Sequence, residues 1–215
     1  MKPYYEHAGI TIYHGDCREV LPTLAPVDLV LTDPPYGVKE NAYRKVSKTK
    51  LASTTDYGDL EWDAEPASGD EIALTVAAGP KCIIWGGNYF TLPPSRGWLV
   101  WDKQNSGNFA DCELAWTNLK MSVRIFRFTW NGMIRQGEWR GKRVHPTQKP
   151  RELMGWCLGF VPDARTILDP FMGSGSVLHA AKNLGRQAIG CEIEERYCEI
   201  AAERLSQEVL PLGEE

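Results

Sequence analysis

The chain has 215 residues, of which 43% are hydrophobic and 24% charged, and its net charge is −4. This composition is typical of one globular domain and excludes a disordered, collagen-like or coiled-coil protein. The sequence has no apolar run long enough for a membrane span, and its first residues lack the apolar core expected of a signal peptide. The six scattered cysteines favour free thiols in a reducing, cytoplasmic compartment without a metal site.

The first half of the chain predicts four strands and one helix from its hydrophobic periodicity. The strands are expected at residues 10–13, 27–31, 81–85 and 97–101, and the helix at about 69–78. The run at 27–31 is almost entirely apolar, as is typical of a parallel strand buried on both faces. It must end at Pro34 and Pro35, because proline has no N–H for the strand ladder. The polar connection 37–65 is long for a compact domain, which predicts a functional or mobile loop.

The second half predicts a β-hairpin or meander followed by alternating helices and strands. The hairpin or meander is expected over residues 111–130, where the strand-forming side chains are Leu114, Trp116, Val123, Ile125, Phe126 and Phe128. Beyond it we expect a helix at 153–160, a strand at 166–169, a glycine loop at 170–176, a helix from 177 to Gly185, a strand at 188–192 and a last helix from Glu195 to about Val209. Strands that alternate with helices predict an α/β sheet with mostly parallel strands, whose ligands bind at the carboxyl ends of the strands.

The charge is distributed unevenly along the chain. Residues 119–151 carry nine bases and one acid, a net charge of +8, whereas residues 191–215 carry a net charge of −6. Such a basic stretch in an acidic protein predicts a surface that meets a polyanion, although a solvated strand-and-loop face would have the same composition. The acidic stretch is expected on the outer face of the last helix.

A glycine loop with a following acid predicts a nucleoside site. Gly173 and Gly175 lie between a strand and a helix, where the backbone can approach a ligand closely. Glu192 ends the next strand and is placed to accept hydrogen bonds from two ribose hydroxyls. Asp169 would repel a pyrophosphate but attract an ammonium group, which favours S-adenosylmethionine, with Lys149 and the loop amides at its carboxylate. The alternative is a structural turn capped by Asp169.

The most specific motif is Asp33-Pro34-Pro35-Tyr36, directly after the apolar strand. Its residues suit the methylation of an exocyclic amine on a base, because such an amine must be held in line by two hydrogen-bond acceptors. Asp33 offers a carboxylate, and Pro34 a backbone carbonyl in a fixed direction. Tyr36 can stack on the base. A plain turn after the strand is the alternative reading. A base inside a duplex has to be flipped out to reach such a site, with the basic stretch and the loop 37–65 holding the DNA.

Taken together, these motifs make the chain resemble the amino-DNA methyltransferases, which form N6-methyladenine or N4-methylcytosine. Asp33-Pro34-Pro35-Tyr36 matches the catalytic motif of the family, and the segment from Asp169 to Gly175 matches its cofactor motif. The segment from His145 to Pro150 is similar to the part that flanks the methionine end of the cofactor. The catalytic motif comes first, as in the circularly permuted β-type group, and Gly15-Asp16-Cys17 occupies the place of the turn that supports the cofactor adenine.

The resemblance implies a Rossmann-like, circularly permuted methyltransferase fold with a seven-stranded, mostly parallel sheet. It implies one domain over 1–215, with a short target-recognition segment at 104–144. The implied catalytic residues are Asp33, Pro34, Pro35 and Tyr36. The implied residues for S-adenosylmethionine are Asp16, Cys17, Asp33, Thr147, Lys149, Asp169, Pro170, Phe171, Gly173, Ser174, Gly175, Glu192 and Ile193. The implied DNA contacts are Arg135, Arg140, Lys142 and Arg143, which suit phosphates but could also read guanine.

The expected activity is methylation of adenine N6 in double-stranded DNA, because an aspartate at the first position of the catalytic motif leans toward adenine in this family. The alternatives are N4-cytosine methylation, methylation of protein glutamine or RNA, and a DNA-binding subunit that keeps the fold without catalysis. The opposite motif order in related protein and RNA methyltransferases disfavours the second of these. The recognition sequence, a homodimer and a partner restriction endonuclease stay open.

Overall fold

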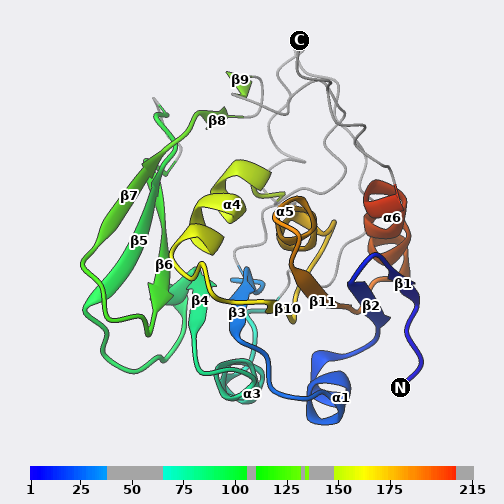
Figure 1. Cartoon of the computed structure of the whole chain (residues 1–215). Coiled ribbons are helices and arrows are strands. Elements are labelled where there is room, and N and C mark those ends of the chain that lie inside the picture. The colour runs from blue at the N-terminus through cyan, green and yellow to red at the C-terminus, as the bar shows by residue number, and fades with distance from the viewer. Residues whose placement is uncertain (38–64, 106–109, 132–133, 136–147, 207–215) are drawn as a thin grey trace.

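A nine-stranded sheet runs through the protein, with helices on both of its faces (Figure 1). The computed structural model describes residues 1–37, 65–105, 110–131, 134–135 and 148–206. Across the sheet the strands are β1 (Tyr5–His7), β2 (Ile10–His14), β11 (Gln187–Glu192), β10 (Thr166–Asp169), β3 (Leu29–Thr32), β4 (Cys82–Trp85), β6 (Cys112–Thr117), β5 (Gly97–Asp102) and β7 (Arg124–Arg127). A separate pair is formed by β8 (Trp130–Asn131) and β9 (Ile134–Arg135).

The sheet is mostly parallel, as predicted, but it has nine strands where the resemblance implied seven. The seven from β2 to β5 form its centre, and β1 and β7 extend its two edges. Only β1 and β6 run against the other strands. The predicted hairpin or meander over 111–130 is wrong in its pairing, because β6 and β7 lie on opposite sides of β5 and do not contact each other as a ladder.

Two groups of helices cover the two faces of the sheet (Figure 1). One face carries α4 (Arg151–Gly159), α5 (Ser176–Asn183) and α6 (Glu195–Ser206), and the other carries α1 (Cys17–Val20) and α3 (Gly69–Ala77). The central strands alternate between the two cores: Leu29 and Leu31 belong to the cluster with α4 and α5, whereas Val30 belongs to the cluster with α1. Burial on both faces explains why the sequence of β3 is continuously apolar.

Most predicted boundaries agree with the structure to within a few residues. The helix expected at 69–78 begins after Ser68, where the side chains and backbones of Ser68 and Glu71 form a reciprocal capping box. The last helix ends at Ser206 within the described residues. The loop predicted over 37–65 lies outside them except for its end residues, and the segment 104–144 is described only in part, including β6 and β7. All six cysteines are free, and none of the described helices is long and apolar enough to cross a membrane.

The order of the strands creates a crevice beside β3 and β10. These two strands are parallel neighbours, paired at Ile167 with Leu29 and at Leu168 with Val30. From β10 the chain passes through α5 to β11 on one side, and from β3 it continues to α3 and β4 on the other. Where connections leave in opposite directions, an opening forms at the carboxyl ends of the strands. Both sequence motifs begin at this point.

Candidate active site

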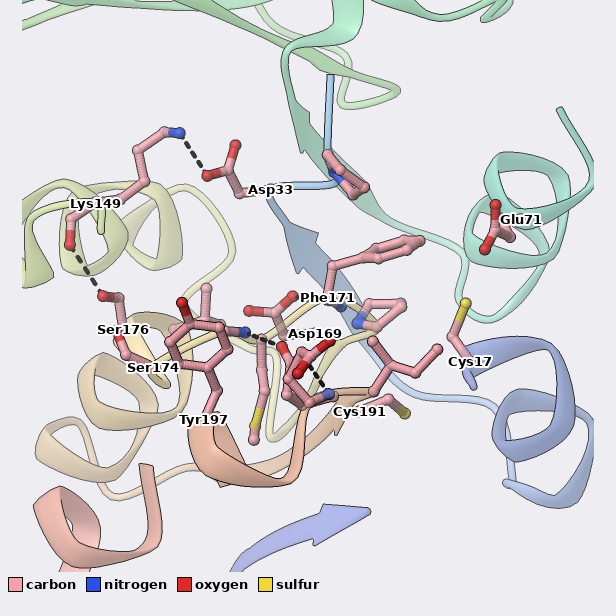
Figure 2. Close-up of a pocket in the computed structure, with 18 of the residues that line it drawn as sticks. Cys17, Asp33, Glu71, Lys149, Asp169, Phe171, Ser174, Ser176, Cys191 and Tyr197 are labelled. Carbon is pink, nitrogen blue, oxygen red and sulfur yellow. Dashed lines mark hydrogen bonds and ion pairs between the residues drawn. The ribbon is translucent and has the colours of Figure 1, made fainter. Parts of the chain in front are cut away.

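A cavity of about 400 Å³ lies at the carboxyl ends of β3, β10 and β11 (Figure 2). It brings together two motifs that are about 140 residues apart in the sequence. The predicted site residues that line it are Asp16, Cys17, Asp33, Pro35, Lys149, Asp169, Pro170, Phe171, Gly173, Ser174, Glu192 and Ile193. Pro34, Tyr36 and Gly175 lie next to lining residues without lining it themselves. Thr147, Arg140, Lys142 and Arg143 lie outside the described residues, and Arg135 ends β9.

Asp169 is a buried carboxyl group on the floor of this cavity. Its side chain accepts hydrogen bonds from the Thr32 hydroxyl at 2.6 Å and from the Phe171 backbone N–H at 3.2 Å. Burial raises the pKa of Asp169 to about 7, although both hydrogen bonds work against that rise. The Thr32 contact also joins the end of β3 to the end of β10, and so holds the two motifs next to each other.

The glycine loop passes from Asp169 to α5 with two residues in left-handed conformations. Gly173 has a φ of 49° and Gly175 a φ of 80°. A Cβ atom on Gly175 would lie 3.1 Å from the Cβ of Ala201 in α6, so a side chain there would crowd the neighbouring helix. The loop therefore requires glycine for both its backbone and its packing.

Glu192 ends β11 and organises the loop beside it. Its two carboxylate oxygens accept hydrogen bonds, each of 2.9 Å, from the backbone N–H groups of Gly173 and Glu194. Burial raises the pKa of Glu192 to about 7 in spite of these donors. Each carboxylate oxygen has a second lone pair, so the group can still accept hydrogen bonds from a ligand in the cavity.

Residues at α1 and α3 form another wall of the cavity. Asp16 caps α1 by accepting a 2.8 Å hydrogen bond from the backbone of Arg18, and the buried Cys17 follows it. Glu71 of α3 reaches the same wall (Figure 2). The ligand atoms of Asp16, Cys17 and Glu71 lie within 4.8 Å of one another. However, Arg18 also binds the Asp16 carboxylate and Ser68 binds that of Glu71, so protein contacts already engage these oxygens.

The Asp33 motif forms the other end of the cavity. The Tyr36 hydroxyl donates a hydrogen bond to Oδ1 of Asp33, and the Lys149 ammonium donates one to Oδ2. Pro34 is buried, and no residue in the described ranges donates a backbone hydrogen bond to its carbonyl oxygen. The ring of Tyr36 stacks on that of Tyr89, with 4.9 Å between the ring centroids and 12° between the planes.

Lys149 lies between the two motifs and is buried. Its backbone oxygen accepts a 2.9 Å hydrogen bond from the Ser176 hydroxyl at the start of α5, while its ammonium points toward Asp33 (Figure 2). Oε2 of Glu113 lies 3.1 Å from the same ammonium. Burial by itself would lower the pKa of Lys149, but Asp33 and Glu113 outweigh it and raise the pKa. The side chain therefore carries its charge between two carboxylates.

Sequence reasoning missed three residues around Asp33. Glu113 lies on β6 within the predicted recognition segment, and its partner Lys103 directly follows β5, just before that segment; no local motif distinguishes either residue. Tyr89 could have been found, since it follows the carboxyl end of a buried strand, β4, as Asp33 follows β3.

Comparisons with known proteins agree with the fold. A family model described as DNA methylase matches residues 100–203. The chain is 28% identical to the Type II methyltransferase M2.LlaDCHI of Lactococcus lactis subsp. cremoris, over 96% of this chain and 93% of that protein. Its structure is similar to that of the PvuII DNA methyltransferase, described as cytosine-N4-specific, with a TM-score of 0.60 and 16% identity over 97% of this chain and 90% of that one. It is also similar to the complex of M1.HpyAVI with S-adenosylmethionine, with a TM-score of 0.54 and 24% identity over 91% of this chain and 99% of that one.

Proposed function

Since the chain belongs to the amino-DNA methyltransferases, we propose that it transfers a methyl group from S-adenosylmethionine to N6 of an adenine flipped out of DNA. The observation that carries this proposal is the shared cavity, in which the Asp33 motif and the glycine loop are two ends of one space. A methyl group can be transferred directly only if donor and acceptor meet in the same site.

The chemistry of the lining residues matches S-adenosylmethionine. Glu192 is an acceptor for the two ribose hydroxyls, and Asp169 is an acceptor for an ammonium group. Phe171, Ile193 and Cys17 offer apolar contact for an adenine ring, beside the turn at Asp16. When bound, this cofactor supplies an electrophilic methyl group on a sulfonium, so no covalent enzyme intermediate is needed. The solved complex of M1.HpyAVI with the same molecule supports the assignment.

Asp33 and Pro34 are the residues that would hold the amine of the base. The carboxylate of Asp33 accepts a hydrogen bond from one N–H, and the carbonyl of Pro34 accepts one from the other. Two acceptors in fixed directions turn the nitrogen lone pair toward the donor and stabilise the positive charge that develops on the nitrogen. Tyr36 is held against Asp33 through its hydroxyl, which keeps its ring beside the place of the base.

The basic residues between the two motifs would contact DNA. Arg135, Arg140, Lys142 and Arg143 belong to the stretch of net charge +8, and the phosphate backbone attracts such a surface. These contacts position the duplex and supply little sequence information. Flipping the base costs a few kcal/mol of stacking, which the phosphate contacts would have to offset.

N4 of cytosine is the second candidate target. The similarity to the cytosine-N4-specific PvuII enzyme favours it, while the aspartate at position 33 leans toward adenine. Both bases carry an exocyclic amine beside a ring nitrogen, so Asp33 and Pro34 could hold either one. The difference must therefore come from the shape of the space around the base.

Digestion of methylated DNA to nucleosides tests the proposal. The protein is incubated with S-adenosylmethionine and DNA from a methylation-free host, and the products are identified by mass spectrometry. We expect N6-methyldeoxyadenosine. Exclusive formation of N4-methyldeoxycytidine would overturn the choice of base. The remaining alternative is a non-catalytic, DNA-binding subunit. Such a subunit would form no methylated nucleoside, and calorimetric titration would detect no binding of S-adenosylmethionine.

A further inference from the structure

Four charged side chains form a continuous chain of contacts at the Asp33 end of the cavity. The Lys149 ammonium binds Asp33 on one side and lies 3.1 Å from Oε2 of Glu113 on the other. The Lys103 ammonium lies 2.5 Å from Oε1 of Glu113 and 5.1 Å from the centre of the Trp101 ring. Two carboxylates and two ammonium groups thus alternate, and their formal charges cancel.

Both oxygens of Asp33 are already used in this arrangement. Tyr36 donates to Oδ1 and Lys149 donates to Oδ2. Each oxygen keeps a second lone pair, so a target amine that binds Asp33 would share an oxygen with one of these donors and weaken the hydrogen bond of that donor. Lys149 is the donor that has an alternative acceptor, because its ammonium already lies 3.1 Å from Oε2 of Glu113, which is buried.

Releasing Lys149 from Asp33 would be costly without that second carboxylate. The side chain of Lys149 is only 7% exposed, so its ammonium cannot turn to bulk water for compensation. A buried charge that loses its partner is strongly destabilised. A carboxylate 3.1 Å away lets the ammonium change partners by a small movement, while the charges within the cavity stay balanced.

We infer that Glu113 is a positioning residue for methyl transfer: it takes over the Lys149 ammonium when the target amine binds Asp33. The inference rests on the proposed function and extends it to a residue that does not touch the base. Glu113 lies on β6, paired with Trp101 of β5, and Lys103 follows that strand directly. Lys103 thereby fixes the carboxylate of Glu113 at the distance from Lys149 that the exchange requires.

The charge state of Glu113 supports this role. Burial alone would raise the pKa of Glu113, but the ion pairs with Lys149 and Lys103 outweigh it and lower the pKa. Glu113 therefore stays ionised and able to receive an ammonium.

The test compares the wild type with Glu113→Gln, Lys149→Met and the double variant in single-turnover methyl transfer to DNA. Glu113→Gln keeps the shape of the side chain and removes its charge, so Lys149 should stay on Asp33. We expect a rate at least about tenfold lower, with the dissociation constant for S-adenosylmethionine within about threefold of wild type. In the Lys149→Met background the same substitution should change the rate by less than about twofold, because its effect passes through Lys149.

An equal loss of rate in both backgrounds, or a wild-type rate in Glu113→Gln, would overturn the inference. If Lys149→Met has no measurable transfer, Glu113→Asp decides, since it restores the charge: recovery of most of the lost rate supports the role, and a loss equal to that of Glu113→Gln contradicts it. Glu199→Gln on the exposed side of α6 is the control. An inactive wild type would count against the proposed function, whereas an active wild type with an active Glu113→Gln variant counts against Glu113 alone.

Discussion

The backbone N–H of Gly173 donates a 2.9 Å hydrogen bond to Oε2 of Glu192, which joins the glycine loop to the acid at the end of β11. The acid therefore shapes the loop as well as the cavity. A second hydrogen bond, from the N–H of Glu194, fixes the other carboxylate oxygen. The proposed cofactor site is thus largely organised by protein contacts alone, which reduces the entropy that a ligand would lose on binding.

Glu192→Ala should weaken the binding of S-adenosylmethionine. The substitution removes the proposed contacts to the ribose and frees the loop N–H of Gly173, for a loss of about 1–3 kcal/mol. Calorimetric titration measures this change in the dissociation constant. Glu195→Ala, on the exposed first turn of α6, serves as the control. An unchanged constant in Glu192→Ala would remove Glu192 from the site.

Asp169→Asn should alter how stability depends on pH. Burial raises the pKa of Asp169 from 3.8 to about 7, so between these values the folded state holds a proton that the unfolded state has lost. The stability contributed by this group therefore falls as pH rises through that window. Asparagine keeps the oxygen that Thr32 and Phe171 bind but cannot ionise.

Urea unfolding of both proteins at about pH 4.5 and about pH 7.5 measures the effect. Relative to the wild type, Asp169→Asn should have a higher free energy of unfolding at the higher pH than at the lower pH. A difference that stays constant between the two pH values would show that Asp169 titrates in the folded protein as it does in the unfolded chain.

Gly86→Ala should disturb the Asp33 end of the cavity without touching the end formed by the glycine loop. Gly86 has a φ of 67°, and a Cβ atom there would lie 2.0 Å from Cε1 of Tyr36. The Tyr36 ring would have to move, and its hydroxyl would lose Asp33. We expect the methyl transfer rate to fall at least about tenfold, with the affinity for S-adenosylmethionine unchanged.

Gly155→Ala is the matched control for this substitution, because nothing lies within 4 Å of a Cβ added at that position in α4. It should leave the transfer rate as it is in the wild type. A Gly86→Ala protein as active as Gly155→Ala would mean that the position of Tyr36 is not important for the reaction.

Local sequence patterns were sufficient to predict the elements around the site. The apolar run before Asp33, the glycines after Asp169 and the acid at Glu192 each have a short-range physical cause, and the structure brings all three to one cavity. The strands β3, β10 and β11 alternate with helices, so their carboxyl ends meet by topology.

Long-range pairing could not be predicted in the same way. The strands β6 and β7 have ordinary strand sequences, and nothing in them indicates that β5 lies between them. The partnership of Glu113 with Lys149 depends on that strand order, because it joins residues 36 positions apart through the tertiary fold. The prediction that Lys149 binds the cofactor carboxylate stays untested, while its ammonium contacts Asp33 and Glu113.

The role of Asp33 is tested most directly by single-turnover transfer of a tritiated methyl group to DNA by Asp33→Ala. We expect the rate to fall by at least about 100-fold, because one of two acceptors for the amine is lost, while the dissociation constants for S-adenosylmethionine and DNA stay within about threefold of wild type. A variant that transfers the methyl group within about tenfold of the wild-type rate would contradict a reaction centred on this carboxylate.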